Sequence, residues 1–208
     1  MSVRVKICGI TNRDDALLAV DAGADALGFI FVEGTPRYVT PQAAAEIIRE
    51  LPPFVTPVGV FWDHPGGHVK AVAEACGLRV LQFHGDESPD DLAGHSAPAI
   101  KTIKVEGPQD LGRLSGYRAR VAAFLLDSRA RWSEGEPRQP IEWELARVAG
   151  QYGRIILSAG LTPDNVARAV GVARPYGVDV NSGVEARPGR KDGERVRRFV
   201  GEARRALA

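Results

Sequence analysis

Short runs of apolar and β-branched residues alternate along the chain with longer stretches in which apolar positions recur at helical spacing. The short runs predict strands and the longer stretches predict amphipathic helices. The expected strands are residues 3–7, 26–31, 56–61, 80–83, 100–104, 122–126, 154–157 and 177–180. The expected helices are residues 12–21, 41–50, 67–76, 89–92, 108–115, 142–149, 163–170 and 192–207.

This alternation predicts the fold class. Strands that alternate with helices pair in parallel through helical crossovers. Eight such units fit a closed (β/α)8 barrel, or TIM barrel, better than an open sheet. The chain has 208 residues, enough for one core and few for two. We therefore expect residues 1–208 to form a single α/β domain.

The same pattern predicts which side chains line the barrel, because side chains alternate between the two faces of a strand. The apolar residues of each strand suit the face toward the helices. Cys8 and Lys6 in the first strand, His84 after the fourth, Asp127 after the sixth and Asp179 in the eighth then point inward. Polar residues thus gather near the C-terminal ends of several strands, where barrel enzymes hold their active sites.

Composition and charge narrow the possible partners and location. The formal net charge is +1, which gives no reason to expect nucleic acid or a membrane surface as partner. The basic C-terminal stretch is interspersed with Glu194 and Glu202, a pattern typical of a solvated helix face. We see neither a signal-peptide core nor an apolar run of membrane-spanning length. Two cysteines form no disulfide framework, which favours the cytoplasm.

Cys8 is the first candidate for chemistry. It lies in residues 6–11 (KICGIT), which close the first strand. An isolated cysteine is more often a small buried hydrophobic residue, and we interpret Cys76 in that way. Cys8, however, stands at the end of a strand, with Lys6 two residues earlier on the same face. A neighbouring cation lowers the pKa of a thiol and favours the thiolate, so Cys8 is a candidate base.

Two further residues carry charge to the same end of the predicted barrel. Asp127 closes the sixth strand and could simply cap a turn. Opposite a cysteine in a barrel mouth, it is also a candidate proton donor. Arg37 lies in the loop after the second strand, where an arginine is commonly solvated. Its guanidinium group could instead bind a carboxylate through two parallel hydrogen bonds.

Small residues follow the seventh and eighth strands, in residues 158–162 (SAGLT) and 181–185 (NSGVE). Many barrels bind a phosphate group with backbone N–H groups after these two strands. Gly160, Ser182 and Gly183 are the candidate phosphate-binding residues. This pattern predicts a phosphorylated small-molecule ligand and does not by itself specify a reaction.

A series of motifs gives the sequence a family resemblance. They are residues 6–11 (KICGIT), 26–31 (ALGFIF), 36–39 (PRYV), 58–61 (VGVF), 81–85 (LQFHG), 125–127 (LLD), 160–166 (GLTPDNV), 178–185 (VDVNSGVE) and 189–192 (GRKD). In this order the chain resembles the phosphoribosylanthranilate isomerase family over almost its whole length. The resemblance implies the Amadori rearrangement of N-(5-phosphoribosyl)anthranilate to 1-(2-carboxyphenylamino)-1-deoxyribulose 5-phosphate in tryptophan biosynthesis, by a monomer or homodimer.

The resemblance also implies roles for individual residues. Cys8 would be the general base, Asp127 the general acid and Arg37 the anchor for the anthranilate carboxylate. The two proton-transfer groups then need opposite changes, a raised pKa for Asp127 and a lowered pKa for Cys8. No metal or organic cofactor is needed, and no His or Cys spacing offers a metal site. The remaining expected ligand contacts are Lys6, His84 and Asp179 to the substrate and Gly160, Ser182 and Gly183 to the phosphate.

Three departures from the family pattern keep alternatives open. Residues 131–137 (RWSEGEP) are more charged and poorer in glycine than the usual loop, Ala159 replaces a common glycine, and Asn181 replaces a frequent serine. The alternatives are another phosphosugar barrel isomerase or epimerase and a non-catalytic barrel that binds a phosphorylated ligand. The combination of Cys8, Arg37 and Asp127 argues against both. For His84, a neutral structural histidine is the alternative.

Overall fold

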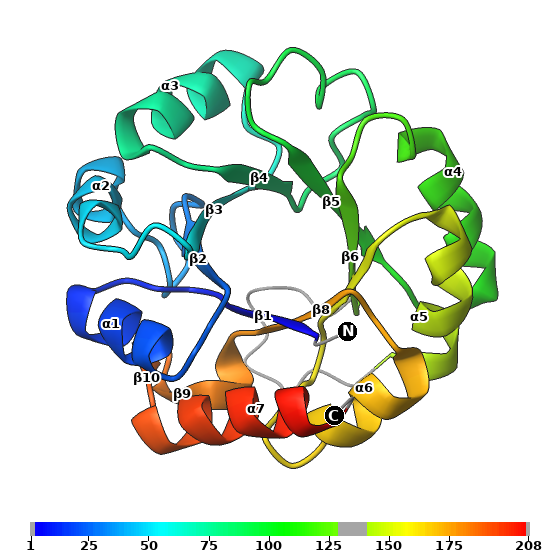
Figure 1. Cartoon of the computed structure of the whole chain (residues 1–208). Helices are drawn as coiled ribbons and strands as arrows, with labels where there is room; N and C mark the ends of the chain where they lie inside the picture. The colour runs from blue at the N-terminus through cyan, green and yellow to red at the C-terminus, as the bar shows by residue number, and fades with distance from the viewer. Residues whose placement is uncertain (1–2, 129–140, 207–208) are drawn as a thin grey trace.

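The computed structural model describes residues 3–128 and 141–206, and it contains a closed barrel of eight parallel strands (Figure 1). The strands are β1 (Arg4–Ile7), β2 (Ala26–Ile30), β3 (Thr56–Phe61), β4 (Val80–Phe83), β5 (Ala99–Lys104), β6 (Ala123–Asp127), β7 (Ile155–Leu157) and β8 (Gly177–Val180). Pairing of β1 with β8, for example Val5 with Val178, closes the barrel. The predicted fold class and all eight predicted strands are confirmed.

Helices surround the barrel as predicted, with some differences in their limits. They are α1 (Arg13–Asp21), α2 (Pro41–Arg49), α3 (Gly66–Cys76), α4 (Leu114–Tyr117), α5 (Trp143–Ala149), α6 (Val166–Ala173) and α7 (Gly193–Arg205). Most of the helix expected at 108–115 is a 3-10 helix, η1 (Pro108–Arg113). The helix expected from residue 163 starts at Val166, because Thr162 and Asn165 close a turn ahead of it. No helix of the described residues is long and apolar enough to cross a membrane.

The helix expected at residues 89–92 is wrong, since this segment forms only turns between β4 and β5 (Figure 1). The outer face of β5 carries Lys101 at this point, and its side chain is buried. The Lys101 ammonium group donates to the Gly85 carbonyl oxygen at 2.8 Å and to Glu87 Oε2 at 2.6 Å. The loop, with this buried ion pair and with Leu92 in the main hydrophobic core, therefore stands where a helix packs elsewhere around the barrel.

The barrel interior is divided by polarity along its axis. Apolar side chains line the N-terminal end of the interior, and a second small group lies near the C-terminal end. The main hydrophobic core lies outside, between strands and helices. Buried polar side chains separate the two interior groups or face the C-terminal end; they are Lys6, Gln82, His84, Thr102, Asp127, Ser158 and Asp179. The predicted inward orientation of Lys6, His84, Asp127 and Asp179 is confirmed, whereas that of Thr102 and Ser158 was not predicted.

A small two-stranded sheet after β8 was not predicted. Strands β9 (Glu185–Arg187) and β10 (Arg190–Lys191) pair in antiparallel fashion after a short 3-10 helix, η3 (Ser182–Val184). The hairpin docks on the segment after β1: Thr11 donates to the Gly189 carbonyl oxygen at 2.7 Å, and the Lys191 N–H group donates to Asp15 Oδ2 at 2.9 Å. These contacts hold the hairpin at the C-terminal end of the barrel.

Candidate active site

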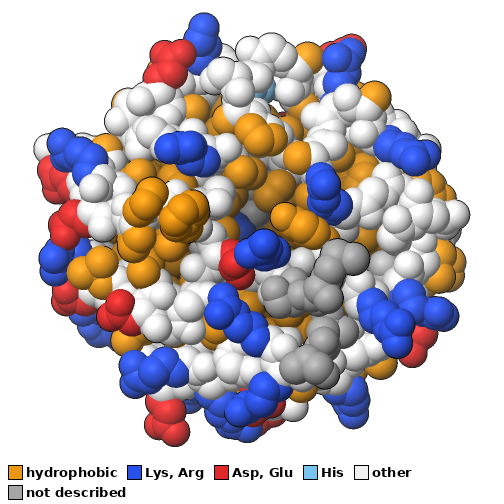
Figure 2. Space-filling model, in the orientation of Figure 1, with side chains coloured by type: hydrophobic (Ala, Val, Ile, Leu, Met, Phe, Trp, Pro, Cys, Tyr) orange, Lys and Arg blue, Asp and Glu red, His pale blue; other side chains and the backbone are white. Residues whose placement is uncertain are grey.

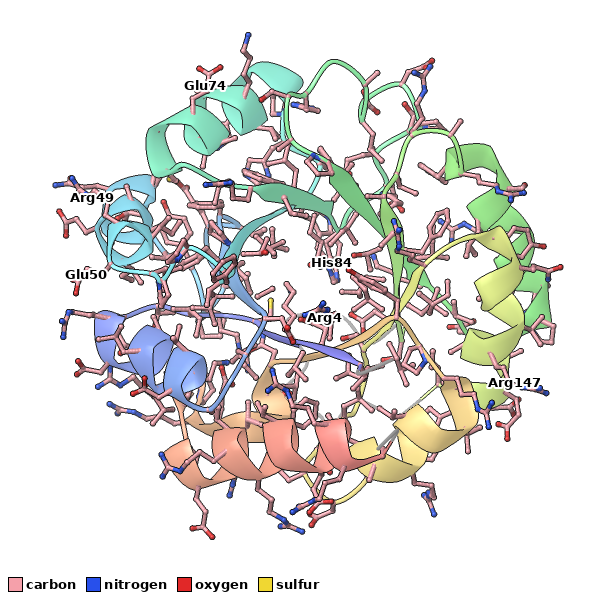
Figure 3. All side chains as sticks on the ribbon, viewed as in Figure 1. Arg4, Arg49, Glu50, Glu74, His84 and Arg147 are labelled. Carbon is pink, nitrogen blue, oxygen red and sulfur yellow. The ribbon has the colours of Figure 1, made fainter. Side chains whose placement is uncertain are left out.

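The candidate site is a recess at the C-terminal end of the barrel. It is lined by Cys8, Ile30, Arg37, Val60, Gln82, His84, Asp127, Ser158, Asp179 and Asn181. In Figure 3, His84 points toward the barrel centre, whereas Arg49, Glu50, Glu74 and Arg147 lie on the outer rim. The structure thus brings Cys8, Arg37, His84, Asp127 and Asp179 together, from five different strands or the loops that follow them.

Cys8 follows β1 and is buried in the recess, where its N–H group donates to the Val180 carbonyl oxygen at 2.9 Å. Gly28 on β2 makes room for its side chain. A Cβ atom at Gly28 would lie 2.7 Å from Cys8 Sγ and 3.0 Å from Lys6 Nζ, closer than van der Waals contact allows. The glycine of the ALGFIF motif therefore allows the thiol and the ammonium group to lie side by side.

The electrostatic balance at Cys8 differs from the sequence-based expectation. Burial raises the pKa of the thiol, and the nearby Asp179 carboxylate raises it further. The Lys6 and Lys191 ammonium groups lower the thiol pKa, but their effect is smaller than that of burial. The expectation of a lowered pKa is therefore wrong, and the direction of the shift favours the thiol form of Cys8 at neutral pH.

Lys6 lies below Cys8 in the barrel and does not line the recess. Its ammonium group pairs with Asp179 Oδ1 at 2.7 Å, and both side chains are buried. Burial opposes the charge on Lys6, but Asp179 and Cys8 raise its pKa to about 12. The structure thus directs Lys6 toward Cys8 and Asp179 rather than toward the open part of the recess. Asp179 also accepts a hydrogen bond of 3.4 Å from the Ser158 hydroxyl group.

Asp127 ends β6 and is almost fully buried. The Ser128 N–H group donates to Asp127 Oδ1 at 2.9 Å, and His84 Nε2 lies 3.4 Å from Oδ2. On its other side, His84 Nδ1 lies 3.2 Å from Gln82 Nε2 and 3.2 Å from Thr102 Oγ1. One tautomer satisfies these contacts, with the proton on Nε2 facing Asp127 and Nδ1 accepting. His84 therefore orients the Asp127 carboxyl group.

An aromatic and cationic edge of the site, Trp62 and Lys104, was not predicted from the sequence. The Trp62 ring lies 5.3 Å from the His84 ring, between centroids, at 30°. Lys104 Nζ is 4.1 Å from the Trp62 ring centroid, within cation–π range. Two signals could have indicated them: an aromatic residue directly after the third strand, and a lysine at an inward position of the fifth.

Arg37 lines the recess, and part of its guanidinium group is hydrogen-bonded to Glu185. Its Nε atom donates to Glu185 Oε1 at 3.0 Å, and its Nη2 atom donates to Oε2 at 2.7 Å. Glu185 also accepts from Lys191 Nζ at 3.1 Å. The sequence analysis quoted Glu185 and Lys191 only as parts of motifs. Their proximity to Arg37 depends on the β9–β10 hairpin, which was not predicted.

The loops after β7 and β8 lie against each other, as the proposed phosphate site requires. A Cβ atom at Gly183 would overlap the Leu161 carbonyl oxygen, so only glycine allows this approach. In the first loop, Ala159 and Gly160 both have left-handed backbone conformations, with φ of 67° and 63°. For Ala159 this conformation costs about 1–2 kcal/mol, which a glycine at this position would avoid. Ser182 and Gly183 start η3, and Gly183 lies against Leu161.

These features together define a class of protein. Within residues 3–128 and 141–206, no group of three or more His, Cys, Asp and Glu side chains could hold a metal ion. The recess instead holds a thiol, a carboxyl group and an arginine at the C-terminal ends of barrel strands. Fold and site together are those of a (β/α)8-barrel enzyme.

Comparison with known proteins identifies the family. The profile of N-(5′-phosphoribosyl)anthranilate (PRA) isomerase matches residues 5–202. An N-(5′-phosphoribosyl)anthranilate isomerase of Geobacter sp. (strain M21) is 52% identical over 202 residues, which cover 97% of this chain and 98% of the relative. The chain therefore belongs to the phosphoribosylanthranilate isomerase family and is an isomerase of tryptophan biosynthesis.

Two solved structures show the same fold. Monomers derived from the dimeric phosphoribosylanthranilate isomerase of Thermotoga maritima superpose with a TM-score of 0.87 at 38% identity, over 97% of this chain and 98% of that one. A phosphoribosylanthranilate isomerase in complex with reduced 1-(o-carboxyphenylamino)-1-deoxyribulose 5-phosphate also gives a TM-score of 0.87, at 39% identity and the same coverage. Both relatives support the expected barrel and the expected activity.

Proposed function

We propose that residues 1–208 act as one catalytic domain in which Asp127 is the general acid and Cys8 the general base of the Amadori rearrangement. Asp127 protonates the ribose ring oxygen as the bond between C1′ and this oxygen breaks, which leaves an iminium ion. The Cys8 thiolate then takes the proton from C2′. The resulting enolamine tautomerises to the aminoketose. The presence of both groups in one recess of a family member carries this proposal.

The other recess residues suit the two ends of the substrate. Arg37 binds the anthranilate carboxylate with the edge of its guanidinium group that Glu185 leaves open. Backbone N–H groups of Gly160, Ser182 and Gly183 bind the phosphate group. Asp179 contacts the ribose. His84 lies between the Trp62 ring and Asp127, so it positions the acid beside the anthranilate ring.

Turnover of the substrate by the purified protein tests this function. N-(5-phosphoribosyl)anthranilate should be consumed with loss of its fluorescence, and the product should be the carboxyphenylamino-deoxyribulose phosphate. The combined Cys8→Ala and Asp127→Asn variant serves as the blank. A protein that binds the reduced product analogue but does not turn over the substrate would instead be the non-catalytic barrel. Turnover of a different phosphosugar alone would support the other alternative.

We propose that the chain forms a homodimer, since one relative is described as dimeric. We place its interface at the N-terminal end of the barrel. A cavity of about 290 Å³ opens there, and its lining includes Val58, Val80, Ile100 and Ile156. Phe54 stands at its edge with 95% of its surface exposed. A turn after Pro52 holds it outward, since the Val55 N–H group donates to the Pro52 carbonyl oxygen.

An exposed aromatic side chain and a cavity with an apolar part of its wall lie on one face, so the face can be self-complementary, as a two-fold dimer requires. Figure 2 shows hydrophobic side chains gathered around the centre of one end of the barrel. In the dimer, Phe54 of each copy would enter the cavity of the other.

The dimer should dissociate when Phe54 is replaced by a charged residue. Sedimentation at micromolar concentration should give a dimer for the wild type and a monomer for Phe54→Asp. Val148→Asp is the matched control, because Val148 is also an exposed apolar residue but lies on α5 and does not line the cavity. A monomeric wild type, or a dimeric Phe54→Asp variant, would show that this face is not the interface.

We also propose a cytoplasmic location. Both cysteines are free thiols, which is typical of a reducing compartment.

A further inference from the structure

Three charged side chains form a buried cluster beside the recess: Arg37 after β2, Glu185 on β9 and Lys191 on β10. The Glu185 carboxylate lies between the two cations. It accepts from Arg37 Nε and Nη2, from Lys191 Nζ and from the Gly189 N–H group. The exposed fraction of the side chain is 18% for Arg37, 4% for Glu185 and 0% for Lys191. Of the three, only Arg37 lines the recess.

The cluster has a definite net charge. Burial alone would raise the pKa of Glu185, but Arg37 and Lys191 lower it below its usual value, so Glu185 is ionised. Burial lowers the pKa of Lys191 from 10.5, and the Glu185 carboxylate opposes that change. Lys191 Nζ faces three oxygen acceptors within 3.5 Å, Glu185 Oε1, Asn181 Oδ1 and the Asn181 carbonyl oxygen, which match the three donors of an ammonium group. One carboxylate between this ammonium group and the Arg37 guanidinium group leaves the cluster at +1. Without Lys191, Glu185 would neutralise Arg37.

The cluster is packed directly against the catalytic end of β1. A Cβ atom at Gly9, the residue after Cys8, would lie 2.6 Å from Asn181 Oδ1 and 3.1 Å from Arg37 Cδ. Lys191 Nζ donates to the same Asn181 Oδ1 atom at 3.0 Å. Lys191 does not itself line the recess. It lies behind Arg37 and Asn181, which do.

A buried lysine is an energetically unfavourable means of fixing the position of a hairpin. Taking an ammonium group out of water costs several kcal/mol, and apolar side chains of similar volume often stabilise such a site equally well or better. The β9–β10 hairpin also has backbone contacts of its own to Thr11 and Asp15. Packing therefore does not explain the charge on Lys191.

We propose that Lys191 is a specificity-determining residue that acts through Glu185: its charge offsets the Glu185 carboxylate and keeps Arg37 a net cation for the carboxylate of the ligand. Glu185 positions the guanidinium group, and Lys191 prevents it from being neutralised by this positioning contact. The inference rests on the proposed role of Arg37 as the carboxylate anchor. It assigns to Lys191 a role in recognising the anthranilate half of the substrate.

Binding of two matched probes tests the inference. The first is reduced 1-(o-carboxyphenylamino)-1-deoxyribulose 5-phosphate, and the second is the same compound without the carboxyl group. Lys191→Met should weaken binding of the first about tenfold or more, the order expected when one nearby positive charge of a partly buried site is lost. Binding of the second should stay within about twofold. Lys191→Arg, which keeps the charge, should restore most of the lost affinity.

A second variant separates charge from structure. In the combined Glu185→Gln and Lys191→Met variant, Arg37 is no longer neutralised and the cluster returns to +1. This variant should recover most of the preference for the carboxylated probe. Arg190→Met is the matched control, because Arg190 is the exposed neighbour of Lys191 on β10 and its loss removes the same charge. It should leave both affinities unchanged.

The binding results distinguish a wrong inference about Lys191 from a wrong role for Arg37. If Lys191→Met weakens both probes equally, or the combined variant recovers no preference, Lys191 has only a structural role and the inference is wrong. It is also wrong if Lys191→Met keeps the full preference of the wild type. If the wild type shows no preference for the carboxylated probe, or Arg37→Ala retains it, the anchor role of Arg37 in the proposed function fails instead.

Discussion

Replacing Asp127 with asparagine should lower kcat by about 10²–10⁴-fold, the usual contribution of a positioned acid. The asparagine side chain keeps the volume of the aspartate and can still accept from the Ser128 N–H group, as Asp127 does at 2.9 Å. It cannot donate a proton to the ribose ring oxygen. The affinity for the reduced product analogue, measured by titration calorimetry, should change much less than kcat.

Asp164→Asn is the matched control for this experiment. Asp164 is an exposed carboxylate that pairs with Arg198 and does not line the recess. Its loss should leave kcat unchanged. A kcat of Asp127→Asn within a few-fold of the wild type would remove Asp127 as the acid and make His84, its neighbour at 3.4 Å, the next candidate.

Replacing Cys8 with alanine should lower kcat by at least about 10²-fold while the protein stays folded. Cys8→Ser should be nearly as inactive, because a hydroxyl group is a much weaker base than a thiolate at the same position. The measurement is single-turnover conversion of N-(5-phosphoribosyl)anthranilate, together with circular dichroism to confirm the fold. Cys76→Ala is the control: Cys76 is equally buried but lies in α3, with its thiol hydrogen-bonded to the Pro41 carbonyl oxygen. Near-normal turnover of Cys8→Ala would exclude Cys8 as the base.

The raised pKa of the Cys8 thiol gives the same reaction a characteristic pH dependence. Because burial favours the neutral thiol, only a minor fraction of Cys8 is thiolate at neutral pH. The thiolate-dependent rate should therefore increase as the pH rises toward the raised thiol pKa. Lys6→Met removes a charge that lowers this pKa, so it should move the Cys8 titration, followed by thiolate absorbance against a Cys8→Ala blank, to still higher pH. An unchanged titration would show that Lys6 does not act on the thiol.

The order and type of most elements were predictable from the sequence, because the apolar pattern is a local property of the chain. Eight strand patterns, each with a buried face, can satisfy their backbone groups in a closed parallel barrel. The same alternation predicted that Cys8, Asp127 and Asp179 point inward. Two glycines of the quoted motifs lie at close approaches, Gly28 beside Cys8 and Gly183 beside Leu161, but these contacts were not predictable from the sequence.

The tertiary structure alone decided the environment of the site residues. A lysine two residues before a cysteine predicts a lowered thiol pKa, but burial outweighs that cation, and burial depends on every strand around the recess. The turns at residues 89–92, where a helix was expected, also accompany a contact that arises only on folding. The Lys101–Glu87 pair forms only when β5 and the preceding loop meet. The contact of Arg37 with Glu185 joins positions far apart in the sequence, and no local pattern reports such a contact. Residue types and their order therefore determined the barrel and the positions of the candidate acid and base. The pKa of the Cys8 thiol and the ion pairs of the site residues depend on desolvation and on long-range charge pairing, which arise only on folding.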